Sequence, residues 1–463
     1  MKRRFPYTTS LAFFAALSIP IALSGQNQTP SDKTSSTGSA LQGQAQNDPA
    51  DDDQTSRSGA MNYLLRTVRF TGSIRERWEE TDGPFSVTPA DSYVLSQERL
   101  GLSFQPSSWL HFVVEAQDAR VLFYKTTPSS AISNPIDLHY AWVSLGNSEG
   151  PGTFVQVGRQ NLVIGSGHLI ASLDDWWGNT ARDFDVVNGS YTTKFFKTQL
   201  VAGSEVLINP DAPDEHKPGD HFYVDYNTFG HLVPGASLEP YFIARTYDGV
   251  KSKEGQAGNA ETLALGGRWI GKLPGSFDYN FEPMHEYGYY SSDQLDANAL
   301  LAGAGWTSTP FGWKTRVSTD YEYASGDNEK KNGTRETFDN MFGFNQPMNS
   351  LTGAFGFKNL KDLRSGVEFT PVKKLKIKVD GREFWLANTA DGLYNALGTL
   401  TVHNMKATSA HVGESIEMMA TATLTKNTAF GFGVGTLFPG EYLKQSGKDQ
   451  AYLYPYISFI QKF

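Results

Sequence analysis

The stretch T-P-V-K-K-L-K-I-K-V-D-G-R at residues 370–382 combines a tight turn with a strand whose two faces differ in polarity. After the turn, apolar and charged residues alternate with a period of two, which is the side-chain period of a β-strand. One face of this strand therefore meets an apolar phase and the other meets water. The apolar positions are Leu375, Ile377 and Val379, and the charged positions are Lys376, Lys378, Asp380 and Arg382.

Three further stretches, 263–269, 277–282 and 316–323, separate apolar from charged residues in the same way. In a soluble β-sandwich the apolar face would point into a core. In a membrane barrel it points outward to lipid, and the polar face lines a wet lumen. Alternation alone does not distinguish these two folds, so the connections between strands have to decide.

The connections between residues 68 and 463 alternate between short turns and longer polar loops. Eight short turns and nine other connections, most of them longer, make seventeen connections and therefore eighteen strands. An even number of strands, with short turns at one end and long loops at the other, is typical of a bacterial outer-membrane barrel. We therefore predict an all-β, transmembrane antiparallel β-barrel of about 18 strands, with short periplasmic turns and long extracellular loops. The eight turns lie at 105–108, 147–152, 196, 233–236, 272–275, 308–312, 370–374 and 425–428.

The end of the chain supports a membrane barrel over a soluble sandwich. Ile457, Phe459 and the terminal Phe463 share one face of the last strand, and three tyrosines crowd the other face. A final strand that ends on an aromatic residue is the signal read by the outer-membrane assembly machinery. We therefore expect that machinery, outer-membrane lipid and lipopolysaccharide to be partners of a monomeric barrel. The tyrosines are Tyr452, Tyr454 and Tyr456.

The first 25 residues have the pattern of a secretory signal peptide. Lys2, Arg3 and Arg4 precede an apolar run at 11–23 that is too short to span a bilayer, and small residues follow it. Removal of this segment would change the formal net charge from −9 to −12, because it carries three positive charges and no negative ones. Residues 26–65 have few large apolar side chains and are predicted to be a disordered linker. The chain has no cysteine, which excludes a lipoprotein anchor and disulfides.

Two strands and two loops deserve separate predictions. Polar groups occupy both faces of 115–121, and Arg159 shares a face with Val155 and Val157. A β-bulge in each strand would restore the alternation, because it shifts the parity by one residue. The longest predicted loops, 325–360 and 387–411, are expected to fold over or into the outer mouth, since loops of this length are usually functional or disordered.

An ordered set of short motifs resembles the bacterial alginate export family of outer-membrane channels. The resemblance covers about residues 66–463 and is carried by the order of the motifs, since no single one is specific. Three positions depart from the usual family pattern: His168 replaces an arginine, Ala181 replaces a glycine, and the segment 413–417 differs from G-H-E-x-D. The matching motifs are Gly158-Arg159-Gln160, Asp175-Trp176, Arg182-Asp183-Phe184-Asp185, Tyr323-Ala324-Ser325-Gly326-Asp327 with Phe338-Asp339, Phe384-Trp385-Leu386-Ala387 with Asp391 and Tyr394, Val412-Gly413-Glu414, and the segment 435–440.

The resemblance implies a channel that passes an anionic polysaccharide, an alginate-like uronate polymer, or a related acidic solute. Arginines on the inner face would attract carboxylates through bidentate hydrogen bonds, and interleaved acids would let the solute leave again. The resemblance places Arg159 and Arg182 near the constriction. An alternative is that arginine–carboxylate pairs only brace the lumen. The predicted substrate-binding residues are Arg75, Arg77, Arg99, Arg159, Arg182, Asp185, Arg268, Arg316, Arg364 and Arg382, with Arg245 as a further lumen candidate.

Other functions are less well supported by the sequence. A general or substrate-selective porin for small solutes uses the same architecture, and a surface barrel enzyme is a more distant alternative. The chain contains no G-x-S-x-G elbow, H-E-x-x-H helix or P-loop. His285 and Glu286 are adjacent on an alternating strand, so their side chains face opposite ways and do not share a metal. The low basic content argues against nucleic acid as a partner, and we expect no cofactor, no metal and no enzymatic activity.

Overall fold

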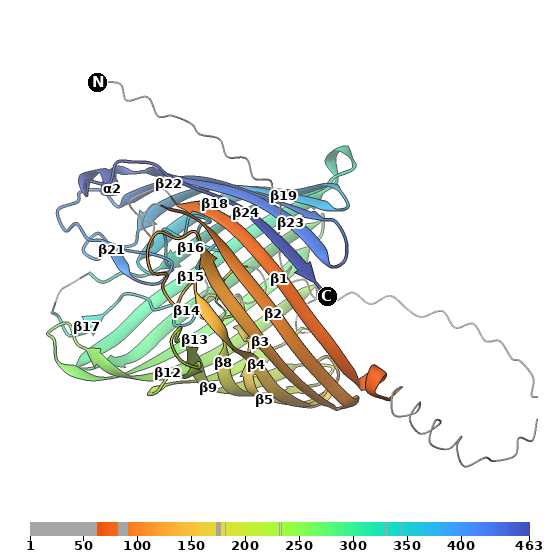
Figure 1. The fold of residues 1–463 in the computed structure, drawn as a ribbon. Coiled ribbons are helices and arrows are strands. Elements are labelled where there is room, and N and C mark those ends of the chain that lie inside the picture. Colours follow the sequence, from red (N-terminus) through yellow and green to blue (C-terminus); the bar gives the residue numbers. More distant parts are fainter. Residues whose placement is uncertain are drawn as a thin grey trace, which may run out of the picture.

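The computed structural model describes residues 63–81, 91–172, 177–180, 182–230, 232, 234–328, 331–343 and 345–463. Within these residues, eighteen antiparallel strands form a closed barrel, because the first strand pairs with the last (Figure 1). This confirms the predicted fold class. The strands are β1 (Val68–Thr81), β2 (Asp91–Ser107), β3 (Leu110–Leu122), β4 (Asn134–Gly146), β5 (Gly152–Gln160), β8 (Phe184–Thr192), β9 (Lys197–Leu207), β11 (Asp220–Thr228), β12 (Ala236–Lys251), β13 (Ala257–Leu273), β14 (Phe277–Tyr290), β15 (Asp293–Ser308), β16 (Lys314–Ala324), β18 (Leu360–Val372), β19 (Leu375–Leu386), β22 (His411–Thr423), β23 (Thr428–Pro439) and β24 (Tyr452–Lys462).

The remaining elements are short and belong to connections. Two of them, β10 (Glu215–His216) and β17 (Thr334–Arg335), add to the barrel sheet at its long-loop end. Four others form two small sheets, β6 (Val163–Ile164) with β7 (Ile170–Ala171) and β20 (Leu393–Tyr394) with β21 (Leu400–Val402). A single-turn 3-10 helix, η1 (Pro310–Gly312), lies in one tight turn, and helix α2 (Glu441–Gln445) follows β23.

The predicted connections are confirmed at all eight short turns, each of which joins two neighbouring strands of the barrel. The opposite end carries the long connections, with two exceptions: β14 and β15 are joined by only Ser291 and Ser292, and β12 and β13 by only the five residues 252–256. None of the helices in the described ranges is both long and apolar enough to cross a bilayer. The predicted signal peptide and nearly all of the predicted linker lie outside the described residues.

The strand faces agree with the predicted parity. Leu265, Trp269 and Val317 are exposed on the outside of the barrel, where their strands meet the apolar phase. Their neighbours Arg268 and Arg316 point inward and pair with carboxylates. On the last strand the three tyrosines are almost fully buried on the inner face, and Phe463 is exposed.

Neither predicted bulge is found in its own strand. In the β3–β4 pair the register shifts between Glu115 and Ala116, but the extra residue is His139 on β4, and β3 pairs with β2 without a shift over 112–122. Likewise, β5 pairs with both of its neighbours without any shift around Arg159, so both predictions are wrong. Arg159 therefore keeps the face of Val157, which is exposed on the outside of the barrel.

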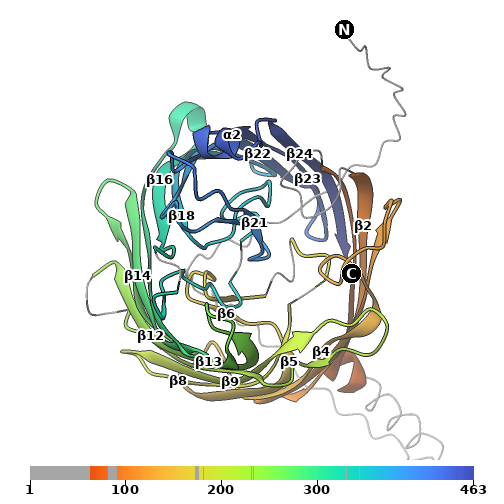
Figure 2. The same cartoon turned by 90° about the vertical axis from the view of Figure 1, so that its left-hand side faces the viewer.

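The inside of the barrel is filled by connections from the long-loop end (Figure 2). Phe338, Phe342 and Phe357 from the β16–β18 connection are buried in one apolar cluster with residues of the barrel wall. A second cluster contains Phe355 from the same connection and Leu393 from the β19–β22 connection. The structure thus confirms, for the described residues, that the two longest loops fold into the outer mouth.

Candidate solute pathway inside the barrel

The arginines at the start of the barrel hold one of the internal connections. Arg75 and Arg77 lie on the inner face of β1, and both are almost fully buried. Arg75 donates to the carbonyl oxygen of Gly178, and Arg77 donates to that of Trp177 at 2.6 Å. The guanidinium of Arg77 also lies 4.3 Å from the centre of the Trp177 ring and 2.5 Å from Glu79. These two arginines therefore anchor the β5–β8 connection against the wall.

A second group forms a ladder of ion pairs on the inner face of β12 to β19. Arg268 pairs with Glu239 at 3.1 Å, and Arg316 pairs with Asp278 at 2.5 Å. Arg364 lies between Asp320 and Asp380, and donates to the latter at 2.7 Å. Lys378 also pairs with Asp380 at 2.7 Å. The ladder alternates cations with acids along the wall.

Glycine on the strand between two partners makes one rung of this ladder possible. Arg316 lies on β16 and Asp278 on β14, so the guanidinium has to cross β15. At the crossing point the inner face of β15 carries Gly305, where an added Cβ would lie 2.2 Å from a guanidinium nitrogen of Arg316. The absence of a side chain at Gly305 therefore leaves room for the guanidinium of Arg316 to reach the carboxylate of Asp278.

Arg382 is more deeply placed than the members of the ladder, with a side chain that is 3% exposed. It donates to Asp362, to the carbonyl oxygen of Asn349 at 2.6 Å and to that of Met348. Glu417 on the next strand accepts hydrogen bonds from Ser350 and from the backbone of Leu351. This buried group fixes the middle of the β16–β18 connection to the barrel wall.

Two arginines hold the same connection at Phe342 and Gly343. Arg182 pairs with Glu205 at 3.0 Å and donates to the carbonyl oxygens of Phe342 and Gly343. Arg245 makes a bidentate pair with Asp220 and stacks on the Phe342 ring at 4.1 Å. Arg99, the last of the predicted arginines on the inner face, donates to Gln117 at 2.8 Å.

Arg159 and Asp185 require a correction. They form a bidentate pair across β5 and β8, with distances of 2.9 and 3.0 Å. Both share a strand face with an exposed valine, Val157 or Val187, so they lie on the outer side of the wall. The carbonyl oxygen of Asp214, in the β9–β11 connection, covers the pair at 3.0 Å. The prediction that Arg159 faces the lumen is therefore wrong.

Several residues that hold the internal segments were missed in the sequence. Asn359 donates to the carbonyl oxygens of Asn388 and Gly392 and so joins the two longest loops. Lys358 pairs with Asp339 at 2.7 Å within the β16–β18 connection. Burial raises the pKa of Asp339, but Lys358 and Arg245 more than compensate and hold it below the usual range. Nothing in the sequence distinguishes such residues from solvated loop residues.

The comparison with protein families decides the affiliation of the chain. The family described as "Alginate export" matches residues 66–453, which include every strand of the barrel up to the start of β24. The chain belongs to the alginate export family. A search of curated proteins found no match.

Solved structures share the fold at low sequence identity. The outer membrane protein OpdK from Pseudomonas aeruginosa superposes with a TM-score of 0.60, at 9% identity, over 86% of this chain and 99% of that chain. OccK2 (OpdF) from the same organism, solved in complex with glucuronate, has a TM-score of 0.56, 9% identity, and coverage of 86% and 98%. OccAB1 from Acinetobacter baumannii has a TM-score of 0.56, 9% identity, and coverage of 86% and 96%. Family and fold together make this chain an outer-membrane β-barrel channel protein.

Proposed function

We propose that the channel passes an acidic sugar polymer of the uronate type through the arginine-bearing side of its lumen. The observation that carries this proposal is the ladder of Arg268, Arg316 and Arg364 on the inner wall. Their side chains are between 13% and 33% exposed, so part of each guanidinium faces the lumen. Guanidinium groups bind carboxylates with two parallel hydrogen bonds and stay charged at any physiological pH.

The carboxylates of the ladder allow a bound solute to be released as well as captured. Each arginine already has a carboxylate partner, so a passing uronate would compete with that partner for donors. A site that binds weakly and repeatedly lets a solute leave as readily as it enters. Low-dielectric walls around an aqueous path also strengthen the field of fixed charges. The ladder can therefore favour acidic solutes in a protein that is acidic overall.

The structural relatives support the same class of solute. One is described in complex with glucuronate and another with vanillate, and both ligands are carboxylates. Those ligands belong to the relatives, whose identity to this chain is below 10%. The second candidate function, a porin for small acidic solutes, is favoured by the internal segments, because they occupy space that a polymer would need.

Planar-bilayer recordings distinguish the candidates. For the polymer channel, uronate oligomers added on one side should block the current in a length-dependent way, and neutral glucans of matched length should not. For the small-solute porin, monomeric glucuronate should permeate and longer oligomers should leave the current unchanged. Equal effects of acidic and neutral sugars would refute both candidates.

The arginine ladder has its own test. Replacement of Arg268, Arg316 and Arg364 by Gln should move the reversal potential toward cation preference, and more strongly at low salt, where charges are less screened. The matched control is Arg159→Gln. In the structure Arg159 lies on the outer side of the wall. Loss of selectivity in the control alone would assign selectivity to Arg159 instead.

A further inference from the structure

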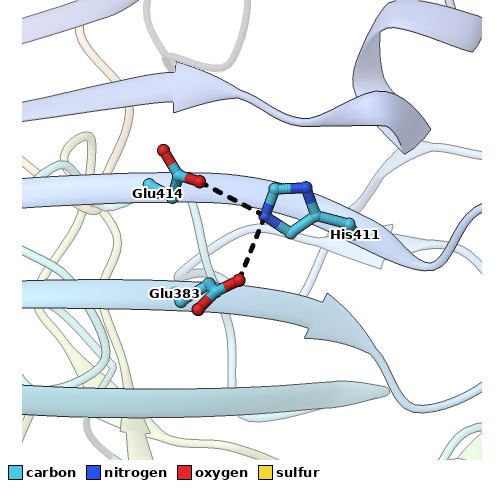
Figure 3. A group of neighbouring side chains, drawn as sticks. All are labelled: Glu383, His411 and Glu414. Carbon is cyan, nitrogen blue, oxygen red and sulfur yellow. Dashed lines mark ion pairs between the residues drawn. The ribbon is translucent and has the colours of Figure 1, made fainter.

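A cluster of Glu383, His411 and Glu414 lies on the outer face of the barrel, at the end that carries the long loops (Figure 3). Glu383 is near the end of β19, and Glu414 is its direct cross-strand partner on β22. Both glutamates share the outward parity of exposed Ile416 and Leu363. The cluster therefore borders the apolar belt of the barrel and lies apart from the lumen.

A β-bulge brings the histidine into this cluster. Phe384 pairs with Gly413, but Trp385 pairs with His411, so Val412 is the extra residue on β22. Without the bulge, His411 would have the parity of Ser415, which is buried on the inner face. The bulge instead turns the imidazole to the face of the two glutamates. Bulges commonly re-aim a side chain at functional positions in this manner.

The distances within the cluster are longer than hydrogen bonds. Nε2 of His411 lies 3.7 Å from a carboxylate oxygen of Glu383 and 3.9 Å from one of Glu414. This nitrogen is buried and has no hydrogen-bond partner among the described residues. The three ligand atoms all lie within 4.8 Å of one another. A single ion placed between these three ligand atoms would contact all of them.

The negative charges of the two glutamates also favour the binding of a cation. Two glutamates directly opposite each other on neighbouring strands repel. Their position beside apolar side chains makes an uncompensated pair of charges more costly. Lys361, which lies opposite Trp385 on this face, makes no ion pair with them among the described residues. A doubly charged cation would cancel both carboxylates.

We propose that Glu383, His411 and Glu414 form a binding site for a divalent transition-metal ion such as zinc. Bonds of about 2.0–2.2 Å from zinc to nitrogen and oxygen ligands, in tetrahedral geometry, separate ligand atoms by roughly 3.4 Å. The two gaps from His411, 3.7 and 3.9 Å, require an adjustment of only a few tenths of an ångström, and the two carboxylates lie within 4.8 Å of each other. Calcium fits less well, since it takes six to eight oxygen ligands and the cluster supplies one imidazole and two carboxylates.

The bound ion would hold together the two strand ends from which the β19–β22 connection leaves and to which it returns. The β19–β22 connection leaves the wall just after Glu383 and returns at His411, so the site joins the two ends of a loop that fills the lumen. Three protein ligands leave a fourth position open for water or for an anionic group outside the barrel. The proposal does not depend on the nature of the transported solute.

The test is zinc binding to the full-length protein in detergent, after removal of metals with a chelator and with excess magnesium to occupy weak carboxylate sites. Isothermal titration calorimetry should show one zinc site. His411→Ala and Glu414→Gln should each weaken it at least tenfold, and zinc should raise the thermal unfolding midpoint of the wild type and of the control described next, but not of these two variants. His285→Ala is the matched control, because His285 is also an outward histidine near a carboxylate, 3.9 Å from Asp296.

The controls keep the test decisive. Glu414→Gln preserves the size of the side chain, so its β-sheet circular dichroism spectrum should match that of the wild type. Equal zinc affinity in the wild type and in both variants would overturn the proposal. So would the absence of a zinc site in the folded wild type, or a loss of zinc caused by His285→Ala instead.

Discussion

Among the single residues, Arg316 and Arg382 illustrate two roles of an inward arginine. Arg382→Met would leave Asp362 buried without its cation, which typically costs about 3–5 kcal/mol. Arg316→Met would remove a partly exposed pair, worth about 0–1 kcal/mol. We therefore expect a large drop in the thermal unfolding midpoint for the first variant and a small one for the second. Circular dichroism melting in one detergent provides the measurement.

The same pair of variants separates structure from selectivity. Arg316→Met should reduce anion preference while leaving the fold intact, because the side chain of Arg316 is one-third exposed on the inner face of the wall. If Arg382→Met melts like the wild type, then Arg382 does not hold the β16–β18 connection. In that case the buried contacts with Asn349 and Met348 contribute little to stability.

The faces of most of these arginines could be predicted from the sequence, but their partners could not. A period of two places Arg316 and Arg382 on the inner face whatever the surrounding loops do. The exception is Arg159, for which the sequence suggested a bulge and the structure keeps a regular register. The partners of Arg182 and Arg382 include loop carbonyls more than thirty residues away in the chain, and no local pattern specifies them.

Among the segments inside the barrel, the β16–β18 connection is the one whose removal tests whether these segments restrict the pore. Its aromatic residues Phe338, Phe342, Phe355 and Phe357 are buried inside the barrel. Replacement of 328–357 by a short Gly-Ser linker should therefore raise the single-channel conductance severalfold. The matched control shortens 209–213 in the β9–β11 connection, whose Asp214 accepts a hydrogen bond from Arg159 on the outer side of the wall, and it should leave the current unchanged. An unchanged current in both variants would mean that this connection does not restrict the pore.

A fall in pH should weaken the attachment of the β16–β18 connection inside the barrel. The direction of this effect follows from the pKa of Asp339. Its pKa in the folded protein is held below the usual range, so ionisation of Asp339 stabilises the closed loop above the ordinary pKa. That stabilisation is lost as the pH falls through the lowered pKa. The wild type should thus keep its low conductance at mildly acidic pH.

Removal of the lysine partner should shift this behaviour. Lys358→Met takes away the larger of the two cationic effects and leaves only Arg245 to oppose burial, so the pKa of Asp339 should rise relative to the wild type and the rise in conductance should move to higher pH. Lys361→Met is the control, because Lys361 lies on the outside of β18. A conductance–pH profile that is identical in all three proteins would show that Asp339 does not hold the loop.

The turns and loops could be predicted from the sequence more completely than the contacts that hold them in place. The eight short turns follow from local chemistry, since Gly, Pro, Asn and Ser favour turns for reasons contained in a few residues. The infolding of 325–360 was expected from its length, but the apolar clusters that fix it depend on residues from distant strands. Asn359, which joins two loops, has no signature that a single sequence would display.

In the whole molecule, the barrel closes where its first strand, β1, meets its last strand, β24. Gly72 on β1 and the terminal Phe463 exchange two backbone hydrogen bonds of 3.0 Å, and β1 continues the pairing with β24. An added Cβ at Gly72 would lie 2.4 Å from the Phe463 ring, so the glycine makes room for that ring. The terminal residue thus has a place in the closed seam as well as a proposed role in recognition by the assembly machinery.

Two variants distinguish these roles. Deletion of Phe463 removes both the residue that we propose the assembly machinery reads and the end of the seam, whereas Gly72→Val disturbs the seam and keeps Phe463. If recognition dominates, the deletion should strongly reduce the folded protein in the outer membrane, and Gly72→Val should reduce it far less. Refolding of both variants into detergent without the machinery should then proceed to similar yields. A poor detergent refolding yield for both variants, with parallel losses in cells, would instead assign the effect of Phe463 to closure of the barrel.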